Sequence, residues 1–315
     1  MAYKIGDKIG KYKLTSKFIK AGNCEWGFAS YNGTEYFIKH FKKYIYPGKE
    51  SSGSEENKPK KRKLCELFEA RHKAIQEALS HLGDGGLVVK PVDFFKHGNT
   101  PDGPQHYFKV THKIDTNSII KDVHTLSPEQ RLFVMLTTNY AVSILHSQQI
   151  IHFDIKPDNI LVHQYGIKTI AKLIDFDDSI IAGGTINCDD IVGDTTYYSP
   201  ELLQYKITGG ETQTPDFKSD IFALGLVFSK YWLGQLPICD SDCSPAETII
   251  NENRLSLDPY VTYIKSDSRV RSTMNLTPEE QIIRLIKNMI APRPKKRPTA
   301  QEVHSCLTNI INKFK

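Results

Sequence analysis

The sequence has few cysteines and no long run of apolar residues. Its 315 residues include 6 Cys, too few for disulfides to hold a chain of this length together, so we expect reduced thiols and a cytoplasmic protein. The best apolar run, residues 221–228, contains a glycine and falls far short of the roughly 20 residues that span a bilayer. Lysines recur through residues 1–20, where a signal peptide would need an apolar stretch. We therefore expect no membrane association.

An excess of one charge is also missing. The chain has 41 Lys and Arg against 36 Asp and Glu, a formal charge of +5, which is weak for a nucleic-acid-binding surface, so we expect no nucleic-acid partner. The one dense basic run, residues 58–63, lies beside a Gly/Ser/Glu stretch and is interpreted as a solvated loop. Cys239 and Cys243 have no second ligand pair, so a zinc site is not predicted.

Hydrophobic patterning differs between the two ends of the chain. Residues 12–41, 87–95 and 106–111 are strand-like, and Asn32-Gly33 is a hairpin signal. A linker-like stretch at 46–57 precedes a helix predicted at 64–82. Further helices are predicted at 128–146, where Ser127 to Gln130 has a capping-box pattern, and at 215–233, 278–290 and 300–312. The pattern predicts an α+β fold in which a strand-rich front and a longer helical back form two lobes.

One segment carries the residue types that phosphoryl transfer requires. Transfer from ATP needs a base for the acceptor hydroxyl, a cation against the developing charge, and oxygen ligands for magnesium. Asp154 is the candidate base, Lys156 the candidate cation for the γ-phosphate, and Asn159 with Asp175 the candidate metal ligands.

This spacing resembles the catalytic and metal loops of eukaryotic-type Ser/Thr protein kinases, and other landmarks of that family follow in order along one domain. The resemblance implies that Lys39 anchors ATP, that Asp220 binds backbone amides of the catalytic loop, and that Glu201 of Ser199-Pro200-Glu201 pairs with Arg297. It also implies a two-lobed kinase fold with a small β-rich lobe (12–111), a hinge (112–115) and a helical lobe (116–312). A kinase of this kind would use ATP with Mg²⁺ or Mn²⁺.

The resemblance extends to the nucleotide site, with departures. Residues 22–27 have the length of the family's glycine-rich phosphate loop, although Cys24 replaces the middle glycine between Gly22 and Gly27. Ala29 and Phe37 stand where the family usually has valine and alanine, which suggests an exchange of small and large side chains above adenine. The hinge contacts would be Thr111, His112 and Ile114.

The glutamate that pairs with Lys39 in this family is ambiguous here. Glu66, Glu69 and Glu77 lie on one predicted helix, and the usual spacing falls at Gln76. Two extra helical turns would bring Glu69 onto the required face, so Glu69 is selected as the partner.

Two substitutions bear on regulation. Phe153 replaces the arginine that normally meets an activation-segment phosphate, so the resemblance implies activity without that phosphate. Asp177 replaces the glycine after Asp175-Phe176 and is either a further metal neighbour or a solvated or capping residue.

The resemblance implies protein substrates, autophosphorylation and, from a narrower likeness to bacterial stand-alone kinases, a partner phosphatase of the metal-dependent class. A pseudokinase scaffold is the alternative, motivated by Cys24, Phe153 and Asp177. A small-molecule kinase of the aminoglycoside type would not explain Glu201 with Arg297.

Overall fold

The structure is a computed structural model that describes residues 3–51, 57–83, 85–165, 168–184, 186–240, 242–252, 255–257 and 276–314. The chain divides into two compact units, Met1–Leu82 with Val89–Asn117, and Gly83–Val88 with Ser118–Lys315. Segment 83–88, expected in the first lobe, thus belongs to the second unit. Among the described helices, none has the length and apolar character needed to cross a membrane.

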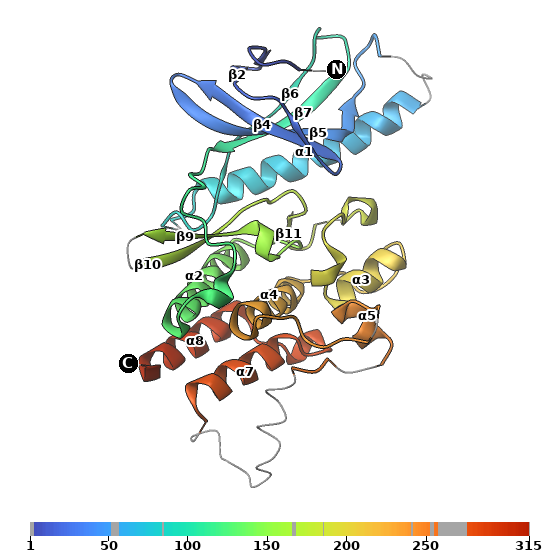
Figure 1. Cartoon of the computed structure of the whole chain (residues 1–315). Helices are drawn as coiled ribbons and strands as arrows, with labels where there is room; N and C mark the ends of the chain where they lie inside the picture. Colours follow the sequence, from blue (N-terminus) through green and yellow to red (C-terminus); the bar gives the residue numbers. More distant parts are fainter. Residues whose placement is uncertain are drawn as a thin grey trace. The chain divides into compact units, whose positions relative to one another are not determined.

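The first unit is a curled antiparallel sheet with one long helix (Figure 1). Its strands follow the order β1-β2-β4-β5-β7-β6, with β3 also paired to β4. The elements are β1 (Lys8–Ile9), β2 (Tyr12–Leu14), β3 (Ile19–Ala21), β4 (Cys24–Tyr31), β5 (Thr34–Tyr46), α1 (Asn57–Ser80), β6 (Pro91–His97) and β7 (Gln105–His112).

The predicted Asn-Gly turn joins β4 to β5. Tyr31 pairs with Thr34 across it, and Asn32 and Gly33 have φ of 48° and 77°. Consecutive positive φ values suit the right-handed twist of a two-residue hairpin. The turn is confirmed, and it sets the register of β5 against β4.

The two faces of this sheet pack into separate apolar clusters, because successive side chains of a strand point to opposite sides. One face carries the cluster Ile9, Tyr12, Leu14, Ala29, Ile38, Phe108 and Val110. The other carries Phe41, Phe94 and Tyr107, which pack with Cys65 and Phe68 of α1. Lys39 is two residues from Phe41 on β5 and therefore lies on the α1 side.

Helix α1 begins seven residues earlier than predicted, at Asn57 instead of 64. The interpretation of residues 58–63 as a loop was wrong, because this basic run forms the first turns of the helix. Arg62 donates to the carbonyl of Pro47 (3.2 Å), and the Lys58 ammonium lies 3.4 Å from the carbonyl of Lys49. Lysine and arginine have high helix propensity. The loop prediction considered only their charge and overlooked this propensity.

The second unit is mainly helical (Figure 1). Its helices are α2 (Pro128–Ser147), α3 (Pro200–Ile207), α4 (Phe217–Leu233), α5 (Pro245–Ile250), α7 (Pro278–Met289) and α8 (Ala300–Phe314). Short 3-10 helices are η1 (Val123–Thr125), η2 (Pro157–Asn159), η3 (Cys188–Asp190), η4 (Thr195–Tyr197) and η6 (Pro294–Lys296). Strands β9 (Ile160–Tyr165) and β10 (Lys168–Leu173) pair with each other, as do β8 (Ile150–Ile151) and β11 (Ile180–Ile181).

Local sequence signals placed α2, α4, α7 and α8 within about two residues, whereas the short helices α3 and α5 were not predicted. Ser127 accepts from the amide of Gln130, and Gln130 accepts from the amide of Ser127, so the predicted capping box is confirmed. The strand predicted at 87–95 was misplaced: β6 starts at Pro91, while Val88 bridges Leu173 in the second unit.

Candidate active site

Asp154 is at the centre of a compact polar cluster that follows β8. The ammonium of Lys156 donates to both oxygens of Asp154 (2.9 and 2.7 Å). The amide nitrogen of Asn159 donates to Oδ2 and to the backbone carbonyl of Asp154 (2.7 and 2.8 Å). The three predicted residues are therefore brought together, and the Asp154 carboxylate is held by two side-chain donors.

Asp220 fixes the backbone on which Asp154 sits. This aspartate is buried in the first turn of α4, and its two oxygens accept from the amides of His152 and Phe153, each at 2.9 Å. Phe153 has a φ of 62°, which is uncommon for a bulky residue and requires such support. The predicted role of Asp220 is confirmed.

Three further residues around this loop had no role in the sequence analysis. His146 of α2 lies 2.9 Å from Oδ2 of Asp220. His152 receives the amide of Asp154 on Nδ1 (3.2 Å), and its Nε2 lies 3.2 Å from the carbonyl of Ile174. Ser179 is buried and donates to the carbonyl of His152 (3.3 Å). The only signal in the sequence was their closeness to Asp154 and Asp175.

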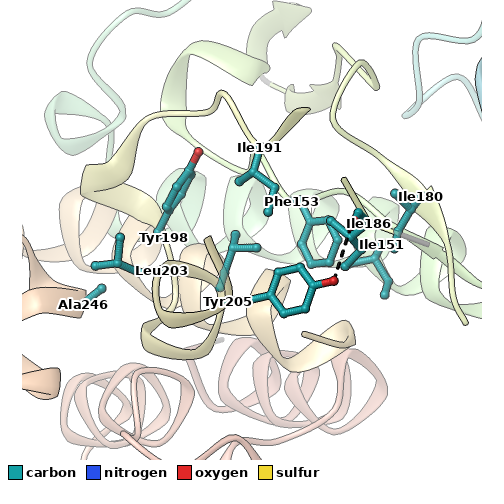
Figure 2. Packing of buried hydrophobic residues seen from close by; sticks show 10 residues of the cluster. Ile151, Phe153, Ile180, Ile186, Ile191, Tyr198, Leu203, Tyr205 and Ala246 are labelled. Atoms are coloured by element: carbon teal, nitrogen blue, oxygen red, sulfur yellow. Dashed lines mark hydrogen bonds between the residues drawn. The ribbon is translucent and has the colours of Figure 1, made fainter. Parts of the chain in front are cut away.

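Phe153 packs into an apolar cluster that includes the segment after Asp175. Figure 2 shows its ring among Ile151, Ile180, Ile186 and Ile191. Tyr205 of α3 belongs to the same cluster and donates its hydroxyl to the carbonyl of Ile186 (3.3 Å, dashed line in Figure 2). In kinases with an arginine at the position of Phe153, that arginine binds a phosphate on the activation segment. Here the buried Phe153 ring contacts the segment after Asp175 by apolar packing instead.

Glu201 and Arg297 form the predicted ion pair. The guanidinium donates to both carboxylate oxygens, at 2.6 and 2.9 Å, in the bidentate geometry that makes such pairs strong. Burial raises the pKa of Glu201, but the hydrogen bonds and charge of Arg297 outweigh it, and the net shift is downward. Ser219 adds a further hydrogen bond to Glu201 (2.9 Å), which ties α3 to α4.

Asn159 and Asp175 lie on chain segments that hydrogen-bond to each other, because the amide of Ile174 donates to the carbonyl of Asn159 (2.9 Å). The side-chain nitrogen of Asn159 donates to Asp154, so the side-chain oxygen of Asn159 is the atom that can accept or ligate. Carboxylate and carboxamide oxygens are the ligands that Mg²⁺ prefers. The residues present therefore fit the metal that the resemblance implies.

Gly193 lies against Asp154. A Cβ built on this glycine would be 2.6 Å from Oδ1 of Asp154 and 3.1 Å from the ring of Tyr198. A side chain here would thus displace the carboxylate, which gives the position a steric reason to be glycine. Asp194, the next residue, caps η4 by accepting from the amide of Thr196 (2.9 Å).

In the first unit, the residues proposed for nucleotide binding occupy three places. Lys39, Phe37 and Thr111 share one sheet face, since Phe37 pairs with Thr111 in the register. Cys24 lies on the same face, where it packs against the apolar cluster that this face forms with α1. At the end of β7, the ring of His112 stacks on Tyr36 (5.3 Å between ring centres). Beyond the strand, Ile114 lines an open pocket of about 650 Å³. Their roles in binding stay predictions.

Residues 22–27 form a tight hairpin instead of an open loop. Ala21 pairs with Cys24 across the two-residue turn Gly22-Asn23, and Gly22 has a φ of 54°. Cys24 and Gly27 already belong to β4. A Cβ on Gly27 would lie 3.0 Å from the hydroxyl of Ser16, so this glycine is needed for close packing.

The proposed size exchange between Ala29 and Phe37 is wrong. Phe37 pairs with Phe28, whereas Ala29 pairs with Tyr36, so the two side chains are on opposite faces of the sheet. Ala29 is fully buried in the cluster with Ile38. Phe37 stacks instead on Trp26 at 5.5 Å. Sequence spacing had placed Ala29 above adenine, but strand register decides which face it occupies.

Glu69 is engaged by other groups than the one predicted. Its oxygens accept from Lys73 (2.7 Å) and Lys96 (2.8 Å), and the hydroxyl of Tyr107 lies 3.2 Å away. These contacts place it level with Tyr107, which pairs with Phe41 and not with Lys39. The pairing of Glu69 with Lys39 gains no support here and stays a prediction.

Comparison with known proteins agrees with this geometry. The family model for the protein kinase domain matches residues 71–306. The ovarian-specific serine/threonine-protein kinase Lok of Drosophila melanogaster is 30% identical over 165 residues, covering 52% of this chain and 31% of the relative. The Wee1-like protein kinase of Oryza sativa subsp. japonica is 31% identical over 163 residues, covering 51% and 25%.

Serine/threonine-protein kinase PSK2 of Saccharomyces cerevisiae is 26% identical over 223 residues, covering 69% of this chain and 17% of the relative. The aligned chain thus spans a third or less of each of these longer proteins. The family match covers well over half of the 315 residues and includes the whole cluster around Asp154. The chain therefore belongs to the protein kinase domain family.

Proposed function

We propose that this chain is a protein serine/threonine kinase that transfers the γ-phosphate of MgATP to hydroxyl groups of proteins, including its own. The observation that carries the proposal is the cluster in which Lys156 and Asn159 hold the Asp154 carboxylate. In this proposal Asp154 takes the proton of the acceptor hydroxyl, and Lys156 opposes the charge that develops on the transferred group.

The metal and nucleotide roles follow from the same family. Asn159 and Asp175 would hold Mg²⁺ or Mn²⁺, which neutralises phosphate charge when bound. Lys39 would anchor the phosphates of ATP from β5, while Thr111, His112 and Ile114 would face the adenine. A metal-dependent protein phosphatase is proposed as a partner that hydrolyses the phosphoesters formed by this kinase, with water as the acceptor and inorganic phosphate as the product.

The test compares wild type with Asp154→Asn and Asp158→Asn in a radiolabelled-ATP assay on the chain itself and on a generic protein substrate. Asp158 is exposed in the same short turn, so its variant is a matched control. We expect Asp154→Asn to lose transfer while retaining nucleotide binding, and Asp158→Asn to keep both. Full turnover in Asp154→Asn would refute the assignment.

A nucleotide-binding scaffold without transfer is the second candidate. The hairpin at Gly22-Asn23 and the strand position of Cys24 favour it, because they leave one glycine with positive φ in the segment expected to cover the phosphates. Wild-type protein that binds ATP but shows no transfer with either metal ion would establish the scaffold.

A further inference from the structure

A buried tyrosine hydroxyl near the Asp154 cluster lacks a hydrogen bond. Tyr198 follows η4 and has 2% of its surface exposed, because its ring packs in the apolar cluster that contains Phe153 and Leu203. Among the residues that the structure describes, its hydroxyl has no hydrogen-bond partner. A buried hydroxyl without a partner destabilises the folded protein, so this atom is a candidate for contact with a ligand.

The edge of the Tyr198 ring lies close to the Asp154 carboxylate, with Gly193 between them. A Cβ on Gly193 would be 3.1 Å from Cε1 of Tyr198, the ring carbon next to the one that bears the hydroxyl, and 2.6 Å from Oδ1 of Asp154. In Figure 2 the hydroxyl of Tyr198 points away from Leu203 and Ala246. The hydroxyl-bearing edge and the carboxylate therefore border the same small space, which the absence of a side chain at Gly193 leaves open.

Negative charge surrounds this hydroxyl. Burial raises the pKa of Tyr198, and the carboxylates that raise it further belong to Asp178, Asp154 and Asp194. The hydroxyl therefore stays protonated and neutral, and its oxygen can accept a hydrogen bond. The ammonium of Lys206 already stands over the face of the ring, 5.4 Å from its centre, in a cation–π contact. These surroundings favour a ligand group that donates a hydrogen bond and carries a positive charge.

We propose that Tyr198 and the exposed Asp194 recognise a lysine or arginine side chain of the protein substrate, close to the acceptor serine or threonine. This inference rests on the proposed function, because it places the acceptor hydroxyl at Asp154. Successive residues of an extended chain are only about 3.3 Å apart, so a side chain that reaches Tyr198 belongs to a residue within a few positions of the acceptor. The tyrosine oxygen accepts from the cation, and the Asp194 carboxylate adds attraction.

The test measures kcat/KM on neutral peptides in which a single lysine is moved stepwise from three residues before the acceptor serine to three residues after it. Peptides with leucine or glutamate at the same position are the references. We compare wild type with Tyr198→Phe, Asp194→Asn and the control Tyr140→Phe, which changes an exposed tyrosine of α2. Asparagine retains an oxygen that can cap η4, so Asp194→Asn removes the charge and keeps the cap.

We expect one lysine position to raise the kcat/KM of wild type about tenfold or more above the leucine peptide, as a hydrogen bond to a charged group does. Tyr198→Phe should lose most of this preference, while its kcat/KM on the leucine peptide stays within twofold of wild type. Its melting temperature should not fall, because the change removes only a hydroxyl without a hydrogen bond. Asp194→Asn should lose part of the preference, and Tyr140→Phe should lose none.

Equal efficiency of wild type on all peptides would overturn the inference, and so would a preference for lysine that Tyr198→Phe retains. An equal loss by Tyr198→Phe on the lysine and leucine peptides would indicate a structural role and would also overturn it. Should Tyr198→Phe lack a cooperative thermal transition, an unchanged preference in Asp194→Asn rejects the inference. In each of these cases transfer by wild type upholds the proposed function. Wild type that transfers phosphate neither to a peptide nor to itself would refute the proposed function, and the inference with it.

Discussion

The loop around Asp154 and the sheet around Lys39 differ in how their functional residues are positioned. In the loop, Asp154, Lys156 and Asn159 are within six residues of one another, and their hydrogen bonds are local. In the sheet, the neighbours of Lys39 come from strands more than ten residues away, Trp26 on β4 and Lys109 on β7. A local cluster follows from residue spacing, whereas a sheet face follows from register.

The two regions also differ in how their residues depart from those usual in the family. Around Asp154 the polar partners remain, and the main change, Phe153, converts a phosphate contact into apolar packing. On the sheet, Phe37 stands where the family usually has alanine and lies on the face of Lys39, so the side-chain volume on that face has changed. The predictions below test how far each region depends on its own contacts.

The largest effect is expected from breaking the ion pair that supports the loop region. Arg297→Ala leaves the carboxylate of Glu201 in a buried site without its cation and should lower the free energy of unfolding by about 3–5 kcal/mol. Lys296→Ala changes the exposed neighbour and should lie within about 0.5 kcal/mol of wild type. Urea denaturation measures both, and equal values for the two variants would contradict the role of the pair.

The sheet region should be the more sensitive to acid. His40 is fully buried; its Nδ1 lies 2.7 Å from Oε1 of Glu25, and its Nε2 lies 2.9 Å from Nδ1 of His106. Burial lowers the pKa of His40 to about 4 and also lowers that of His106. Because the folded state holds these rings neutral, their contribution is complete above pH 6.5 and is lost as the pH falls toward 4.

The size of that loss for His40 is about 3 kcal/mol once titration is complete. Unfolding free energies from pH 7 to 4 should fall less steeply in His40→Phe than in wild type. His81→Gln, which changes an exposed histidine, should follow the wild-type slope. Parallel slopes for all three proteins would show that His40 does not titrate as the structure requires.

A smaller effect is expected from Ala29 and Phe37, which the sequence analysis had treated as an exchange of small and large side chains. Ala29→Val adds methyl groups to a closed cluster and should destabilise the protein by about 1–3 kcal/mol. Because Phe37 is on the other face, Ala29→Val should not recover nucleotide affinity lost in Phe37→Ala. A double-mutant cycle should be additive within about 0.5 kcal/mol, and recovery in the double variant would restore the exchange hypothesis.

The smallest effect is expected from removal of phosphate. Phe153 anchors the segment after Asp175 by burial, and Ser179 is buried in a hydrogen bond to His152, so neither depends on a phosphate. Protein treated with a broad phosphatase should keep most of its initial rate on a generic substrate. A tenfold loss that preincubation with ATP restores would show that another cation takes the role of the arginine that Phe153 replaces. The candidate phosphate positions in the segment are Ser179, Thr185, Thr195 and Thr196, of which Thr185 lies outside the described residues.

Several elements could be read from the sequence because their signals are local. The Asn32-Gly33 turn requires positive φ, the Ser127 capping box joins residues three apart, and Asp154, Lys156 and Asn159 meet within one turn of chain. The contacts of Asp220 and of Glu201 with Arg297 are distant in sequence, and only family resemblance made them predictable.

The amino-acid sequence by itself determined the kinase family, the four longer helices of the second unit and the members of the Asp154 cluster, because each rests on signals between residues that are close in the chain. Tertiary structure alone decided that Ala29 and Phe37 are on opposite faces, that Glu69 binds Lys73 and Lys96, and that Lys109 stands beside Lys39. The physical reason is the two-residue period of a strand: a shift of one position exchanges the faces, and only the pairing of distant strands fixes that position.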